Sequence, residues 1–194
     1  MSKTISFFFC GLIILMLSLP RMAFGQVWPI TNEKQGSKVL YKPNSFIGTE
    51  KNTDGLFISG AKGAFVVSPF KGVVLYSLYT YQFSLIRSQS MSEQVANEIK
   101  SGKRSTSSGE PQDLSMDTKY ICLSVAIKTD ANEIFHFTGL SKYKKLKSGM
   151  KIEIGDTIGL LSYCYKQINQ PCLMITRSLN GVAADPMTPL GLES

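Results

Sequence analysis

The chain has 194 residues, a formal net charge of +7 at neutral pH and a single histidine, His136. A modest positive charge suits anionic partners such as cell-wall polymers, lipid headgroups or nucleic acid. Most zinc hydrolase sites use two or three histidines, so one histidine cannot supply such a set.

Residues 1–25 are typical of a secretory signal peptide, with a basic start and an apolar run over residues 5–19. Ala23 and Gly25 are small residues at the −3 and −1 positions of a cleavage site before Gln26. The apolar run is shorter than a membrane span, although an uncleaved anchor is the alternative. Cleavage leaves 194 − 25 = 169 residues, enough for one domain with a proper core. We expect a periplasmic or cell-envelope protein with no stable membrane span.

The mature chain predicts a mostly β fold. Residues 26–52 are predicted as an extended lead-in that packs against the edge of the domain. Short β-branched and aromatic segments separated by Gly and Pro turns favour antiparallel strands. The predicted strands cover residues 56–58, 64–69, 73–81, 119–128, 133–137, 151–156, 157–163 and 171–177.

Residues 82–118 interrupt this rhythm and are interpreted as an insertion. Ser90 and Glu93 fit a capping box, and Met91, Val95 and Ile99 recur every four residues. This pattern predicts one short amphipathic helix. Residues 103–117 are polar and predict a mobile surface loop.

The last predicted strand has two sulfur-bearing side chains on one face. Cys172 and Met174 alternate with Leu173 and Ile175, which point to the opposite face. An Asn-Gly pair at 180–181 then predicts a tight hairpin turn.

The mature chain has three cysteines, at positions 122, 164 and 172. Export permits a disulfide, and Cys164 and Cys172 flank a seven-residue loop between two predicted strands. They are the favoured pair, but buried free cysteines are the alternative. Any pairing leaves one thiol free.

Five lysines lie close together between positions 142 and 151. A solvated turn explains them most simply. Contact with an anionic polymer is the functional interpretation.

Three segments in order, residues 53–74, 139–159 and 171–186, resemble the lysostaphin-type zinc endopeptidases of bacterial cell walls. Residues 171–177, Pro-Cys-Leu-Met-Ile-Thr-Arg, are similar to the family's Pro-His-Leu-His-Phe-Glu-Val-Arg strand. The resemblance implies an antiparallel β-sheet or sandwich of the duplicated-hybrid-motif kind over residues 53–194, with residues 82–118 inserted.

The resemblance does not extend to the metal site. The family's zinc ligands align with Thr53, Phe57 and Met174, and its catalytic histidines align with Gly139 and Cys172. All five are replaced, so we expect no zinc in this chain. Thiolate and thioether ligands at the last two aligned positions of the final strand would suit Cu(I), although a repacked apolar cleft explains them better.

His136 is the remaining candidate for a site residue. It lies three residues before Gly139, and an odd offset along a strand points to the opposite face unless a bulge intervenes. We therefore expect His136 to point away from the site.

The resemblance implies an exported, catalytically inactive peptidase-like module. It would bind peptidoglycan, or regulate or scaffold an envelope protein, and no nucleic-acid partner is expected. One alternative is an active cell-wall metallopeptidase with atypical ligands. Another is a protein-interaction domain that acts through residues 82–118.

Overall fold

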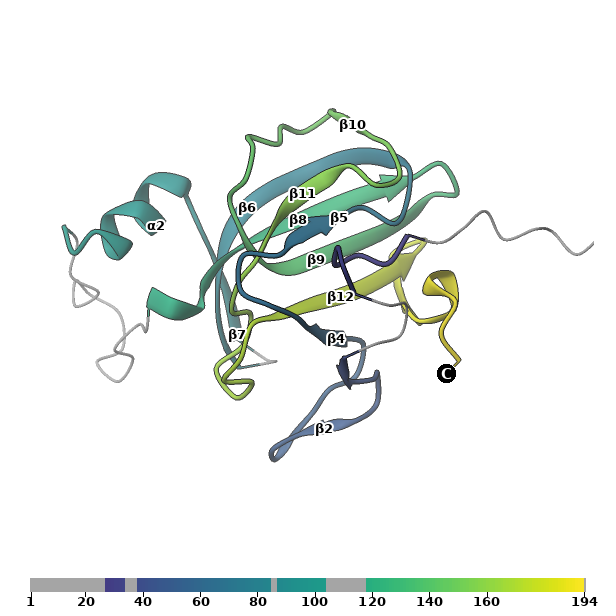
Figure 1. Cartoon of the computed structure of the whole chain (residues 1–194), viewed down its shortest axis with the longest axis horizontal. Coiled ribbons are helices and arrows are strands. Elements are labelled where there is room, and N and C mark those ends of the chain that lie inside the picture. The colour runs from purple at the N-terminus through teal and green to yellow at the C-terminus, as the bar shows by residue number, and fades with distance from the viewer. Residues whose placement is uncertain (1–26, 34–37, 85–86, 104–117, 194) are drawn as a thin grey trace, which may run out of the picture.

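The computed structural model describes residues 27–33, 38–84, 87–103 and 118–193 (Figure 1). The predicted signal peptide over residues 1–25 and most of the predicted surface loop lie outside these ranges. Within them, no helix is long and apolar enough to cross a membrane.

A large antiparallel sheet forms the body of the molecule, which confirms the predicted mostly β class (Figure 1). Its strands are ordered β1-β4-β12-β9-β8-β6-β10. They cover Val39–Tyr41, Leu56–Ser59, Cys172–Leu179, Glu133–Ser141, Ile121–Thr129, Gly72–Ser84 and Lys151–Ile152, in that order. The other strands are β2 (Phe46–Ile47), β3 (Glu50–Lys51), β5 (Phe65–Val67), β7 (Arg87–Met91), β11 (Thr157–Leu161) and β13 (Val182–Ala184).

One face of this sheet is buried in the main core. β11 pairs with the end of β9 and with β5, and Val66 of β5 and Ile158 and Leu161 of β11 are buried in that core. The core includes Leu173 and Ile175 from β12, as the alternation predicted. Cys172 belongs to a second, smaller cluster, and Met174 packs against it. One face of β12 therefore packs into the main core, and the other packs against the second cluster.

The predicted Asn-Gly turn is confirmed. Asn180 and Gly181 have φ values of 53° and 80°, and Leu179 pairs with Val182. Both central residues of a type I′ turn need positive φ, which Asn and Gly tolerate best. β12 and β13 form the resulting hairpin.

Residues 82–118 differ from the predicted insertion at their start. β6 continues to Ser84, and β7 pairs with β6, so this part belongs to the sheet. The helix, α2, covers Glu93–Lys100. Its N-cap is Ser92, which accepts a hydrogen bond from the Val95 amide, rather than Ser90. Ser90 is instead held in β7 by pairing with Thr80.

The described part of residues 26–52, predicted as a lead-in at the edge of the domain, also contributes side chains to the core and strands to the sheets. Trp28 and Ile30 are buried in the main core, and Ile30 bridges to Val66. β1 pairs with β4, and β2 and β3 form a separate two-stranded sheet. The described residues 27–33 and 38–52 are thus an integral part of the domain.

Candidate functional site

A groove lies on the face of the sheet opposite the main core. It has a volume of about 410 Å³, and its lining comes from five strands: β6, β7, β8, β9 and β12. None of its lining side chains carries a formal charge at neutral pH when His136 is neutral. They are Tyr76, Leu78, Thr80, Gln82, Ser90, Ser124, His136, Thr138, Met174 and Thr176.

Three buried hydroxyls form a chain across the middle of the groove. Ser124 lies 2.8 Å from Thr80 Oγ1 and 2.9 Å from Thr138 Oγ1, each distance measured from its Oγ. These side chains come from neighbouring strands β8, β6 and β9, so sheet pairing sets their spacing. Each is buried, and a buried hydroxyl costs free energy unless it is hydrogen-bonded. These three hydrogen-bonded hydroxyls therefore form a polar surface of fixed geometry at the bottom of the groove.

The sequence reasoning did not identify these hydroxyls. The available signal was a single polar residue within an otherwise apolar strand, as at Ser124 within residues 121–127. Period-2 alternation shows that such a residue faces away from the core. It does not show that residues 80, 124 and 138 are neighbours, because that depends on strand order.

In the same groove, the Tyr76 hydroxyl lies 2.7 Å from His136 Nδ1. Burial lowers the pKa of His136 and raises the pKa of Tyr76. Both groups are therefore neutral at pH 7. The Tyr76 hydroxyl donates to Nδ1 when the imidazole proton is on Nε2, and accepts from Nδ1 in the other tautomer.

The expectation that His136 points away from the site is wrong. Leu140 pairs with Leu123 and Thr138 with Ser124, so Gly139 is the extra residue of a bulge in β9. The bulge absorbs one residue of the alternation. His136 consequently lies on the groove side, and Thr176 is its cross-strand neighbour on β12.

Four of the five residues at the family's site positions converge next to this groove. Met174 pairs directly with Phe57 across β12 and β4. Gly139 packs closely against the backbone of Cys172: a Cβ added at Gly139 would be 2.2 Å from the Cys172 carbonyl oxygen. Phe57 and Cys172 belong to the second cluster, together with Ile47, Tyr165 and Ile168, and Met174 packs against it.

Thr53, the fifth, lies elsewhere. It is exposed and donates a hydrogen bond to the carboxylate of Asp54. It lines a separate cavity together with Lys42 and Asp185. Only the other four positions therefore share one location.

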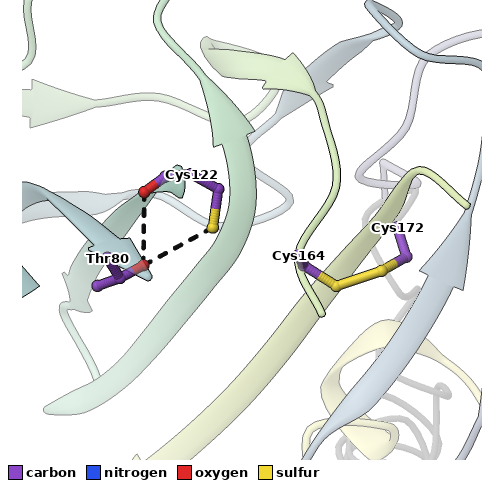
Figure 2. Close-up of a disulfide and its surroundings, with 4 residues drawn as sticks. All are labelled: Thr80, Cys122, Cys164 and Cys172. Atoms are coloured by element: carbon purple, nitrogen blue, oxygen red, sulfur yellow. Dashed lines mark hydrogen bonds between the residues drawn. A yellow bond between two sulfur atoms is a disulfide. The ribbon is translucent and has the colours of Figure 1, made fainter. Parts of the chain in front are cut away.

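A disulfide joins Cys164 and Cys172 within the second cluster (Figure 2). It ties the segment after β11 to the first residue of β12. Of the two alternatives for this pair, a bridge or buried free thiols, the structure contains the bridge.

The third cysteine, Cys122, is free and fully buried in β8. Thr80 Oγ1 lies 3.4 Å from the Cys122 carbonyl oxygen and 3.7 Å from the Cys122 Sγ (Figure 2). Burial raises the pKa of this thiol. Because the thiolate is the reactive form, Cys122 is a poor nucleophile in this environment.

The side chains at the converging positions do not fit a zinc ion. Phe57 has only carbon atoms in its side chain, Gly139 has no side chain, and the Cys172 sulfur is bonded to Cys164. The Cu(I) hypothesis fails for the same reason, since it needs the Cys172 thiolate. Nowhere in the part of the chain that the structure describes do three or more His, Cys, Asp or Glu side chains group as metal ligands would.

No family model matches the chain, and neither does any curated protein sequence. Similar solved structures include the catalytic domain of the antimicrobial peptidase lysostaphin from Staphylococcus simulans. It is 16% identical, with a TM-score of 0.48, over 78% of this chain and 88% of that one.

Two further similar structures come from other bacteria. A catalytic-domain mutant of the prophage-encoded M23 protein EnpA from Enterococcus faecalis is 14% identical, with a TM-score of 0.48, over 76% of this chain and 87% of that one. Csd3 from Helicobacter pylori is 12% identical, with a TM-score of 0.46, over 86% of this chain and 34% of that one.

Proposed function

We propose that this chain is an exported, catalytically inactive peptidase-like module. Its groove would hold an uncharged segment of peptidoglycan or of an envelope protein that it regulates or scaffolds. The observation that carries this proposal is the contrast between two adjacent regions. Phe57, Gly139 and Cys172, at three positions that align with the family's metal site, are buried, whereas the groove beside them is open.

The packing of the former site supports the loss of hydrolysis. Phe57 is fully buried and contacts Tyr41 and Tyr165, with ring centroids 6.2 Å apart in both pairs. Gly139 leaves no room for any side chain, because the Cys172 carbonyl oxygen occupies the space. A metal-bound water needs an open coordination position, and aromatic packing removes it.

The chemistry of the groove supports binding of a neutral partner. Hydroxyl, imidazole and amide groups in the lining offer both donors and acceptors, while Leu78 and Met174 offer apolar contact. A charged ligand group would lose its hydration there without gaining an opposite charge. Short uncharged peptide or sugar segments fit this lining.

Co-sedimentation with purified peptidoglycan sacculi tests the proposal. The informative variant is Thr176→Glu, which places a charge in the uncharged groove. Ser178→Glu is the matched control, because Ser178 lies two residues further along the same face of β12 and does not line the groove. We expect the first variant to lose binding to sacculi, or to a captured envelope protein, and the second to retain it.

Metal analysis and a cleavage assay test the enzymatic alternative. Purified protein would be assayed for bound zinc and for release of muropeptides, with and without a chelator. Stoichiometric zinc together with chelator-sensitive cleavage would overturn the proposal. Equal loss of binding in both glutamate variants would show that the groove is not the binding surface.

A further inference from the structure

The lysine-rich loop between β9 and β10, residues 142–151, is a surface separate from the groove. It contains five lysines and no acidic residue. Four of the lysines are exposed and Lys144 is half-buried. The loop therefore presents a dense positive charge to solvent.

This loop is held in a defined shape. Leu146 is buried in the main core and fixes the middle of the loop. The Gly149 amide donates to the Val74 carbonyl at 2.8 Å, and the Val74 amide donates to the Met150 carbonyl at 2.9 Å. Its charge is thus displayed from a fixed backbone, which lowers the entropy lost when a partner binds.

Most of this charge is not neutralised within the described chain. Lys142 pairs with Glu93 at the start of α2. No acidic side chain among the described residues forms an ion pair with Lys144, Lys145, Lys147 or Lys151. Lys145 lies near enough to Glu93 to help lower the pKa of that carboxyl, so Lys144, Lys147 and Lys151 are the lysines most available to an external anion.

Exposed apolar side chains accompany these lysines. Tyr143 is 54% exposed, and its ring contacts Phe65 edge-on, with centroids 5.2 Å apart. Phe65 is itself 44% exposed, and Met150 is 39% exposed. A polyanion without rings or apolar groups, such as polyphosphate, would be bound by charge alone and would gain nothing from exposed aromatic rings. A bilayer surface uses both, because tyrosine rings settle at the headgroup level while lysines contact anionic lipid.

We propose that residues 142–151, with Phe65, dock the protein onto an anionic phospholipid membrane surface. The lysines would contact lipid phosphates, and Tyr143 would enter the headgroup region. Leu78 lines both the groove and the cleft bordered by Lys142, Lys144 and Lys145. Docking would therefore hold the groove close to the membrane, where the groove can bind a partner at the cell envelope.

Vesicle flotation with the purified exported protein tests this docking. The probes are phosphatidylcholine vesicles with and without phosphatidylglycerol, at low and high salt. The variant carries Lys144→Gln, Lys145→Gln and Lys147→Gln. Each lysine near an anionic surface contributes roughly fivefold to partitioning, so the variant should bind on the order of a hundred-fold more weakly.

A matched variant controls for net charge. Lys51→Gln, Lys103→Gln and Lys166→Gln remove the same three charges from exposed positions outside the loop. This control should retain most of the binding, and Tyr143→Ser should weaken the binding that survives high salt. Circular dichroism melting of every variant separates loss of docking from loss of folding.

Three results would overturn the proposal. One is equal binding to vesicles with and without phosphatidylglycerol. Another is equal weakening in the loop variant and the control variant. The last is retention on polyphosphate immobilised on a resin with no flotation on anionic vesicles, since that outcome identifies a soluble polyanion as the partner.

Discussion

Replacing Gly139 with alanine should destabilise the protein far more than the same change at a comparable glycine. Gly139 has a φ of +104°, and a Cβ there would lie 2.2 Å from the Cys172 carbonyl oxygen and 2.7 Å from the Cys164 Cβ. Gly155 has a φ of +87°, with nothing within 4 Å of its added Cβ. The pair therefore separates backbone strain from steric overlap.

The expected magnitudes follow from these two terms. A positive φ in a residue other than glycine costs about 1–3 kcal/mol at either position. Overpacking adds about 1–3 kcal/mol, and only at Gly139. For a domain of this size, 1 kcal/mol corresponds to roughly 2–4 °C in Tm. Gly139→Ala should lower the Tm by roughly 5–20 °C, and Gly155→Ala by several degrees less.

Thermal and urea unfolding under oxidising conditions measure the two variants. Gly139→Ala should also leave the Gly155→Ala effect unchanged in the double variant, because the positions share no contact in the structure. If the two single variants differ by less than about 0.5 kcal/mol, the steric argument is wrong. That result would also remove the main reason for regarding position 139 as closed to a larger side chain.

Three further predictions concern the cysteines and the histidine. Replacing Cys164 and Cys172 together with alanine should lower the free energy of unfolding by about 2.5 kcal/mol, and reductant should then have no further effect on the urea midpoint. Burial lowers the folded-state pKa of His136 below its ordinary value of 6.5, so the unfolded chain binds the proton first as the pH falls. The contribution of neutral His136 to the free energy of unfolding is therefore complete above about pH 6.5 and is lost on acidification. The urea midpoint of His136→Gln should consequently fall less between about pH 7.5 and about pH 5.5 than that of the unsubstituted protein. Cys122 should resist a thiol reagent in the folded protein and react in concentrated guanidinium. Rapid labelling under native conditions would contradict its burial.

Local pattern was sufficient for most of the strands and for the final hairpin. The alternation of residues 172–175 and the Asn-Gly pair depend only on neighbouring residues, and both are confirmed. The same reasoning misplaced the start of α2 and the end of β6. There, pairing between Ser90 and Thr80 outweighed the local capping pattern, because a sheet partner satisfies the backbone that a cap would otherwise serve.

The expected side of His136 failed for a related reason. Counting residues from His136 to Gly139 assumes a regular strand, and the bulge at Gly139 breaks that count. The glycine itself was visible in the sequence. Its bulge was not, because a bulge is defined by two residues on one strand facing one residue on the partner.

The sequence by itself determined the strand content, the residue types at the positions that resemble the family's metal site, and the presence of a single histidine. Those properties are local or compositional. Only the tertiary structure decided that Phe57, Gly139, Cys172 and Met174 meet while Thr53 does not. It also decided that hydroxyls from β6, β8 and β9 line one groove with His136. Strand order, register and the bulge fix these neighbours, and each depends on contacts between residues far apart in the chain.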